Sequence, residues 1–565
     1  MKNELLHEKR QFENVRSLVE WAGDEWSERY AYSYRNSPLD KEPVKVTFHA
    51  LRNDIRALSS EFISMGCAGK HCAIIGKMSY EWALTYFALL SIGAVIVPLD
   101  KEWKSDELAD TVAKAEVAYL FCDEDIKDKA AAIEKSVELA EPVVYMCSKE
   151  SIRNVRMLTA FGEMKFRNNP NAYFEAEIDP QGLAILVFTS GTTGKGKGVM
   201  LSQEAVISNV ANGIPYIDYG IKTVGVLPPH HTYGSTIMFI GHMIIGSEVY
   251  ISSGLKYITK ELKEQKPEHL VLVPLYLETF YRKIRSSVEE QGKTKLLKGM
   301  MRVSDTLRRV GVDTRRKMFA SVTAAFGGNL KTVISGGAPI NPEIIEFFDS
   351  LGIATLNGYG ITECAPLVAV NHSLHRVNES VGTVLDIDDV KIDEPNEDGE
   401  GEILVKGPNV MIGYYKDEEA TREAFDDEGY FRTGDYGRLT EDNILFITGR
   451  KKNLIILSNG KNVYPEEIEN ALAVNEGIVD IIVYEGQSRR GIEYNAIVAE
   501  IYPDYAYFEK NGIEDIKGHL KGYITEYNKT AVPYKKIAQL KVRREEFPKN
   551  TLRKILRFKL DTTID

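Results

Sequence analysis

The sequence predicts an α/β protein in which a large N-terminal domain holds parallel α/β sheets and a β-rich subdomain, and a small α+β domain follows. Apolar strand-like runs alternate with stretches of helical periodicity from residue 44 to residue 146, which is typical of a parallel sheet covered by helices. After residue 389 the pattern changes to short strands and turns. The chain beyond residue 449 has the size of a separate small domain.

The predicted elements follow in order along the chain. Strands are expected at 44–48, 72–75, 94–97 and 117–122, and again at 224–227, 249–251, 270–273 and 332–335. Ser79 is expected to cap one intervening helix, and Gly66 to end another. We place the domain boundary between residues 449 and 450, which gives domains 1–449 and 450–565.

A helical insertion is predicted at about 286–327, where no strand pattern occurs. Between Lys293 and Lys317 it carries nine Lys and Arg residues against two Asp residues. A solvated pair of surface helices explains such a face most simply. The alternative is a patch that contacts a membrane surface or cofactor phosphates.

Composition narrows the function classes. The 565 residues carry a formal net charge of −12, which argues against general nucleic-acid binding. The five cysteines form no CxxC pair, so zinc and dithiol chemistry are not expected and free thiols in a reducing compartment are. The N-terminus is charged and lacks the apolar core of a signal peptide, which predicts a cytoplasmic protein. Peripheral contact with the inner face of a membrane stays open.

The segment TSGTTGKGKG, residues 189–198, predicts a phosphate-binding loop. It follows the strand-like run 183–189, and its small residues let backbone N–H groups converge on an anion while its lysines supply positive charge. Residues 191–197 also fit the GxxxxGK part of a Walker A loop. However, Gly198 stands where that loop needs a hydroxyl for magnesium, and residues 199–201 look extended rather than helical. A Walker A loop is therefore disfavoured.

Five further segments carry residues suited to nucleotide chemistry: LPPHHTYG (227–234), SGGAPI (335–340), NGYGITECAP (357–366), YFRTGDYGRL (430–439) and ITGRKKN (447–453). A Gly-Gly turn permits close approach to a flat ring, and the aromatic face of Tyr359 suits a purine. Glu363 is a hard oxygen ligand of the kind that Mg²⁺ prefers. Asp435, in a glycine-flanked turn, suits the two ribose hydroxyls. Taken singly, each charged residue here is equally typical of a surface ion pair.

With the final segment FPKNTLRKILR (547–557), these motifs resemble the adenylate-forming, or AMP-binding, superfamily, and most closely its long-chain fatty acyl-CoA synthetases. The resemblance covers nearly the whole chain in the family's order. Two positions depart from the usual pattern: Gly196 replaces a proline, and Arg553 replaces a glycine. The resemblance implies the adenylate-forming enzyme fold, with a C-terminal domain that moves about a hinge at Lys452.

The resemblance also implies roles for individual residues. The catalytic group would be Lys554, Glu363, Thr192 and His231, and Thr192 and Glu363 would share the Mg²⁺ ion. Nucleotide-binding residues would be Thr189, Ser190, Gly191, Thr192, Thr193, Gly194, Lys197, Gly336, Gly337, Ala338, Gly358, Tyr359, Gly360, Thr362, Asp435 and Arg450.

The implied activity is ATP-dependent activation of a long-chain fatty acid to acyl-AMP with release of pyrophosphate, then thioester formation with coenzyme A. ATP, Mg²⁺ and coenzyme A are the expected cofactors and co-substrates. An acyl carrier protein is the alternative acceptor, and another carboxylic acid is the alternative substrate. A non-catalytic nucleotide-binding relative is a further alternative, which the presence of Glu363 and Lys554 disfavours.

Overall fold

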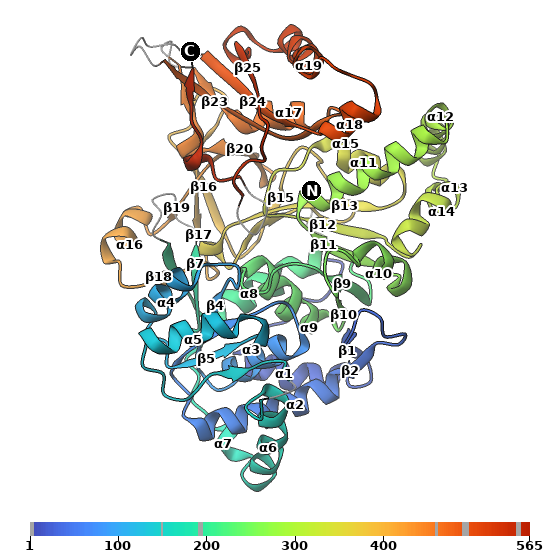
Figure 1. The fold of residues 1–565 in the computed structure, drawn as a ribbon. Coiled ribbons are helices and arrows are strands. Elements are labelled where there is room, and N and C mark those ends of the chain that lie inside the picture. The colour runs from blue at the N-terminus through green and yellow to red at the C-terminus, as the bar shows by residue number, and fades with distance from the viewer. Residues whose placement is uncertain are drawn as a thin grey trace.

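The computed structural model describes residues 5–148, 151–189, 196–457, 461–488, 496–549 and 555–564. Its N-terminal part contains a seven-stranded sheet in the order β18-β8-β7-β4-β3-β5-β6 (Figure 1). The strands are β3 (His71–Ile75), β4 (Val95–Leu99), β5 (Tyr119–Cys122), β6 (Val144–Tyr145), β7 (Ile185–Thr189), β8 (Lys197–Leu201) and β18 (Gly413–Tyr414). From β6 to β7 all neighbours are parallel, as the alternating pattern predicted.

Helices cover both faces of this sheet, so successive residues of its strands are buried on opposite sides. Ile74 and Ile96 belong to one core, which includes α2 (Phe48–Met65), α3 (Tyr80–Leu90) and α8 (Gln203–Gly213). Ala73 and Val97 belong to another, which includes α4 (Ser105–Lys114) and α5 (Lys127–Ser136). All four residues are fully buried. Burial on both faces explains the continuous apolar runs in the sequence.

Several predicted helix signals are confirmed. The Ser79 hydroxyl accepts from the N–H of Trp82 at 3.0 Å, and Gly66 ends α2 with a φ of 83°. The Ser202 hydroxyl likewise accepts from Ala205 at the start of α8. These contacts satisfy backbone groups that a helix end leaves unpaired.

The strand expected at 44–48 differs from the prediction. β2 (Val44–Thr47) pairs antiparallel with β1 (Tyr30–Tyr34) in a separate four-stranded sheet, in the order β2-β1-β10-β9. The other strands are β9 (Lys222–Gly225) and β10 (Glu248–Ile251). Phe48 is already helical because the Thr47 side chain caps α2. β2 is half-exposed, which does not suit the middle of a sheet covered on both faces.

A nine-stranded mixed sheet carries most of the later motifs. Its order is β11-β12-β13-β14-β15-β20-β19-β17-β16, parallel only from β11 to β13. The strands are β11 (His269–Leu272), β12 (Thr332–Ser335), β13 (Ala354–Gly360), β14 (Leu367–Val370), β15 (Gly382–Val384), β16 (Asp389–Asp393), β17 (Gly401–Lys406), β19 (Phe431–Leu439) and β20 (Ile444–Arg450). Its antiparallel half accounts for the short strands expected after residue 389.

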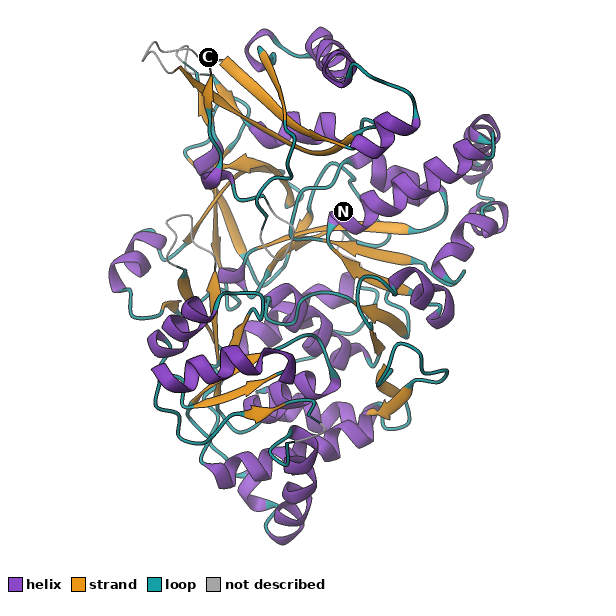
Figure 2. Cartoon of the chain, viewed as in Figure 1, coloured by secondary structure: helices purple, strands orange, loops and turns teal. Residues whose placement is uncertain are grey.

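Helices pack around the start of this sheet and project at one edge of the molecule (Figure 2). They are α10 (Ile258–Gln265), α11 (Pro274–Glu290), α12 (Thr294–Arg309), α13 (Arg315–Met318), α14 (Ala320–Thr323) and α15 (Pro342–Ser350). The remaining helices of the N-terminal part are α1 (Val15–Glu25), α6 (Val155–Asn168), α7 (Asn171–Phe174), a π-helix (Tyr233–Gly241), α9 (His242–Ile245) and α16 (Glu418–Ala424). In the described part of the chain, no helix is both long and apolar enough to cross a membrane.

The C-terminal region forms a separate body at the top of Figure 1. It contains a four-stranded sheet, β25-β24-β23-β26, and a small pair of strands. Its elements are β21 (Ile455–Ile456), β22 (Asn462–Val463), α17 (Pro465–Ala473), β23 (Ile478–Ser488), β24 (Ala496–Pro503), α18 (Tyr505–Lys510), α19 (Ile516–Thr530), β25 (Gln539–Val542) and β26 (Thr563–Ile564). The region has its own apolar core, to which Ile468, Val483 and Phe508 contribute.

Candidate active site

Three predicted residues from separate segments meet at one buried carboxylate. Asp435 on β19 lies opposite Arg450 on β20 in the strand register, and the Arg450 Nε donates to Asp435 Oδ1 at 2.9 Å. The Tyr359 hydroxyl, from β13, donates to Asp435 Oδ2 at 2.7 Å. Asp435 is 3% exposed and Tyr359 is 9% exposed. An ionised carboxylate has about four acceptor positions, so Asp435 keeps capacity for further donors such as ribose hydroxyls.

Local backbone chemistry sets the position of Asp435. Gly434 has a φ of 69°, in the left-handed region that glycine tolerates best. The N–H of Asp435 donates to the Thr433 hydroxyl at 3.1 Å, which in turn donates to the Ile403 carbonyl of β17. Burial, and then the nearby Asp435 charge, raise the pKa of Tyr359 well above its usual value, so its hydroxyl stays a donor.

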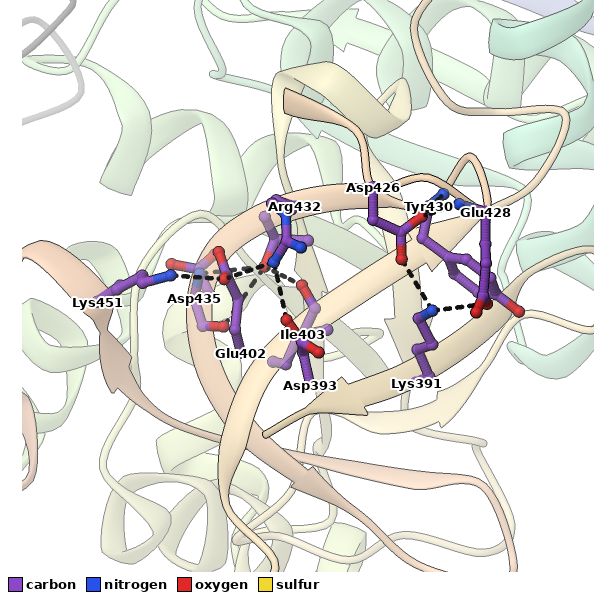
Figure 3. A network of polar contacts seen from close by, with 11 residues as sticks. Lys391, Asp393, Glu402, Ile403, Asp426, Glu428, Tyr430, Arg432, Asp435 and Lys451 are labelled. Atoms are coloured by element: carbon purple, nitrogen blue, oxygen red, sulfur yellow. Dashed lines mark hydrogen bonds and ion pairs between the residues drawn. The ribbon is translucent and has the colours of Figure 1, made fainter. Parts of the chain in front are cut away.

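A charged network surrounds the strands that carry Asp435 (Figure 3). Glu402 on β17 accepts from the Lys451 Nζ at 2.7 Å and lies 3.4 Å from the Arg432 Nη1. Arg432 also pairs with Asp393 at 2.8 Å. Lys451 adjoins the predicted hinge residue Lys452, so these contacts fix the chain just before that position.

Glu363 lies partly buried close to this cluster. Its Oε1 accepts from the Tyr414 hydroxyl of β18 at 3.1 Å, and its backbone carbonyl accepts from Met411 at 2.8 Å. Burial raises the pKa of Glu363, and the Arg450 charge is a smaller, opposing influence. A largely enclosed carboxylate that forms no ion pair with the described residues fits a divalent metal ion, since the ion's charge reverses that effect. Thr192, the second predicted ligand, lies outside the described residues.

Tyr414 is a site residue that sequence reasoning missed. Its ring lies 4.4 Å from the Lys197 Nζ, while its hydroxyl binds Glu363. It therefore connects the end of the predicted phosphate loop to the predicted metal ligand. The signal was weak, because Tyr414 belongs to a two-residue strand between turns.

The predicted glycine turns have separate structural reasons. A Cβ on Gly336 would lie 3.2 Å from the Tyr233 ring, and Gly337 has a φ of 84°. The Tyr233 hydroxyl donates to the Leu272 carbonyl at 3.0 Å. A Cβ on Gly360 would lie 2.1 Å from the Pro366 carbonyl oxygen, so that glycine is needed for backbone packing with or without a nucleotide. Ala338, Gly358 and Thr362 lie in the same strand-end segments, and the predicted nucleotide contacts remain predictions.

His231 lies in the turn before the π-helix, where its carbonyl accepts from the N–H of Ser235 at 2.8 Å. Its ring centroid is 5.0 Å from that of His230. The Nε2 of His230 lies 3.6 Å from Asp100 Oδ2, and burial lowers the pKa of His230. The sequence offered two adjacent histidines, and the family motif directed attention to His231 alone.

A small apolar cavity of about 10 Å³ lies between α8 and the π-helix. Its lining residues are Val210, Gly213, Ile214, Tyr219, Ile237, Gly241, His242, Ile245 and Leu367. The side-chain amide of Asn209 donates to the carbonyls of Cys364 and Leu367, at 3.0 and 2.7 Å. This links the cavity wall to the turn that holds Glu363. Sequence reasoning found none of these lining residues.

Other predicted residues lie outside the described part of the chain or at its edge. Ser190, Gly191, Thr193, Gly194 and Lys554 are outside it, as Thr192 is. Thr189 and Lys197 end the two strands that flank the loop, as expected. The five cysteines are free, as expected, and Cys364 is buried.

Comparison with known proteins now settles the family. The family model described as AMP-binding enzyme matches residues 19–415. The chain belongs to the AMP-binding enzyme family. It is therefore an adenylate-forming enzyme of the acyl-CoA-activating type, and such enzymes use ATP, Mg²⁺ and coenzyme A.

Relatives agree with this assignment. The long-chain-fatty-acid–CoA ligase FadD15 of Mycobacterium bovis is 29% identical over 483 residues, which cover 79% of this chain and 76% of the relative. The ATP-bound MatB of Rhodopseudomonas palustris has a TM-score of 0.72 at 22% identity, covering 96% of this chain and 97% of that chain. The Bacillus subtilis o-succinylbenzoate CoA synthetase with its acyl-adenylate has a TM-score of 0.70 at 21% identity, with the same coverage. At these identities the two solved structures establish the fold of this AMP-binding enzyme.

Proposed function

We propose that this AMP-binding enzyme is a long-chain-fatty-acid–CoA ligase. The observation that carries the proposal is the joining of Asp435, Tyr359 and Arg450 at one buried point, with Glu363 beside them. The polar cluster suits a nucleotide, and the small apolar cavity near the turn that holds Glu363 would have to widen to take an acyl chain. The long-chain relatives support the choice of acid.

In the proposed first step, the fatty carboxylate attacks the α-phosphorus of ATP, which gives acyl-AMP and pyrophosphate. Asp435 and Arg450 hold the ribose, Tyr359 stacks on adenine against Gly336, Gly337 and Ala338, and His231 borders the carboxylate. Residues 189–197 hold the β- and γ-phosphates, and Thr362 contacts the α-phosphate. Lys554 bridges the carboxylate and the α-phosphate. Positioning and charge stabilisation supply most of the catalysis in such transfers.

Mg²⁺ on Glu363 and Thr192 would offset the negative charge that the phosphoryl oxygens gain in the transition state. The described part of that site supports this role, because the Glu363 carboxylate has a pKa raised by burial and forms no ion pair within the described residues.

In the proposed second step, the thiol of coenzyme A displaces AMP. We propose that domain 450–565 rotates about Lys452 between the two steps, so that one site presents different groups to each. An acyl carrier protein is the alternative acceptor. We place the enzyme in the cytoplasm, with peripheral contact at the inner face of a membrane.

The test is pyrophosphate release from ATP with a series of short-chain to long-chain fatty acids, with and without coenzyme A. We expect AMP as the spent nucleotide and faster turnover with long acids. Formation of ADP would contradict the mechanism. Preference for a short or aromatic acid would contradict the substrate, and thioester formed only on a carrier protein would contradict the acceptor.

A further inference from the structure

The apolar face of α12 is wider than the part that the protein covers. Leu297, Met300 and Met301 pack against the core around α11 and α15, and Ser304 between them is 1% exposed. Leu296, Val303 and Val310 are also aliphatic, but they are 58%, 54% and 72% exposed. These three lie seven residues apart, or about two helical turns, and so form a row along one edge of α12. α12 lies at the outer edge of the molecule (Figure 1).

A row of cations runs beside the aliphatic row. Lys295, Lys298, Arg302 and Arg309 are exposed, and none forms an ion pair with any residue that the structure describes. Other cations of the segment are used internally: Arg308 pairs with Asp349 at 2.9 Å, and Arg315 with Asp313 at 2.7 Å. Because the chain as a whole has a net charge of −12, this local excess of positive charge stands out.

The helical geometry separates three faces. At about 100° per residue, the covered residues span one side of α12, and the exposed aliphatic row borders that side. The cations lie roughly 80–140° beyond the aliphatic row, on the side away from the core. A helix lying flat on a bilayer has this order, in which aliphatic side chains enter the interface and Lys and Arg stems extend to the lipid phosphates.

We propose that α12 docks the enzyme on the surface of an anionic lipid bilayer. Leu296, Val303 and Val310, with Val312 just beyond, enter the interface over a length of roughly 20 Å. The four free cations bind lipid phosphates. The composition favours lipid over a protein partner, since protein interfaces are enriched in aromatic residues and Met, whereas this exposed surface is Leu, Val, Lys and Arg.

This proposal extends the proposed membrane contact by assigning it to α12. It does not depend on which acid the enzyme activates. None of its residues belongs to the nucleotide cluster or lines the apolar cavity. Binding to vesicles can therefore be measured without ATP or acid. If the docking proposal fails, vesicle binding is lost while pyrophosphate release is unaffected. If the proposed activity fails, vesicle binding can still be observed.

The experiment is flotation of the full-length protein with vesicles of phosphatidylcholine alone, or with phosphatidylglycerol added. We expect binding only to the anionic vesicles, with weakening at high salt. The variant K295Q/K298Q/R302Q removes three cations, each worth about a fivefold gain near a charged membrane, so we expect affinity to fall roughly 100-fold or more. The variant L296S/V303S/V310S keeps the charges and should also lose most binding.

A matched control is available on α6. Met157, Phe161 and Met164 are exposed there at 38%, 49% and 65%, in a similar row on another helix. M157S/F161S/M164S should leave vesicle binding unchanged, and all three variants should keep pyrophosphate release with a water-soluble acid. Equal binding by the wild type and the K295Q/K298Q/R302Q variant would overturn the proposal. So would binding to an acidic carrier protein, sensitive to the same three cations, when anionic vesicles do not bind.

Discussion

The proposed nucleotide cluster and the apolar cavity proposed for the acyl chain are built differently. In the cluster, the Asp435 carboxylate already has partners on both oxygens, and Glu363 has Tyr414. In the cavity the wall is aliphatic, and its buried polar pair is incompletely satisfied. Polar side chains that are held in place before the ligand binds suit a substrate that is the same in every reaction cycle, such as ATP. An apolar cavity recognises size, and so is the part that separates one acid from another.

The incomplete pair is His242 and His269. The carbonyl of Ile237 lies 2.9 Å from His242 Nδ1, which must therefore carry the proton. His242 Nε2 then holds a lone pair, and at 2.9 Å it accepts from His269 Nε2. His269 Nδ1 is left as a buried acceptor with no hydrogen-bond partner in the described structure. Both rings are thus neutral. A proton on His242 Nε2 would remove the acceptor of this hydrogen bond, and a proton on either ring would place an unpaired charge in the buried interior.

The largest expected effect comes from Lys554→Ala, which sharpens the comparison by testing the nucleotide side alone. We expect adenylate formation to fall roughly 1000-fold, the scale of losing one charge-stabilising donor in a transition state. Thiolysis of supplied acyl-AMP should be spared. Pyrophosphate release and thioester formation from acyl-AMP measure the two halves separately. Equal loss in both would contradict the division of labour between the two steps.

Asp435→Ala should have the next largest effect. It removes the proposed ribose contact and leaves Arg450 and Tyr359 without their buried partner, at a cost of about 3 kcal/mol, or roughly 100-fold in kcat/KM for ATP. The KM for the acid should stay unchanged, because the cavity is apolar and separate. Asp393→Ala, in the adjacent and more exposed network, is the control and should stay near wild type. If the KM for the acid rose together with the KM for ATP, the nucleotide cluster and the acyl cavity would not be independent, which contradicts the comparison.

Sequence and structure agree best on the nucleotide side for a physical reason. Polar contacts there come from short segments in which residue type and spacing are both constrained, as in the YFRTGDYGRL segment around Asp435 and the GYGITE segment around Glu363. Tyr414 was not predicted, because a single tyrosine between turns has no characteristic spacing from other residues. The parallel sheet was predictable from alternation, whereas the antiparallel pairing of β2 with β1 is a contact between strands that the local pattern of β2 does not specify.

The cavity could not be predicted in the same way. Its lining comes from α8, the π-helix, α9 and the start of β14, and aliphatic residues in those elements look like ordinary core. Only the packing shows which of them border an empty volume. The π-helix at Tyr233–Gly241 also follows an unusual backbone path, for which the apolar run around Thr236–Ile245 gave no signal.

The His242–His269 pair predicts that the protein becomes less stable to unfolding as the pH falls. Burial lowers the pKa of His242 to about 4, and that of His269 well below its usual value. An unfolded histidine binds a proton at about pH 6.5, so the unfolded state gains protons first and stability falls as pH drops below that value. His242 alone should lower the free energy of unfolding by about 2 kcal/mol between neutral pH and pH 5.

Thermal unfolding between pH 7.5 and 5 measures this effect. His242→Phe removes the titrating group, so its melting temperature should depend less on pH than that of the wild type, although Phe also loses the contact with Ile237. His7→Gln, at an exposed position, is the control and should retain the wild-type slope. An unchanged slope in His242→Phe would mean that other groups govern acid sensitivity.

The smallest expected effect comes from Gly241→Ala, which tests whether the cavity limits the length of the acyl chain. Gly241 lines it, and a Cβ there would have its nearest neighbours at 3.7–3.9 Å, so Gly241→Ala should add a methyl group without a clash. The methyl group takes space from about one methylene of the acid, worth about 0.8 kcal/mol, or roughly fourfold in kcat/KM for the longest acids. Shorter acids and ATP should be unaffected, and Gly299→Ala on α12, with no atom within 4 Å of the added Cβ, is the control. A uniform loss across all chain lengths would instead indicate a change in the π-helix, and the assignment of this cavity to the acyl chain would then fail.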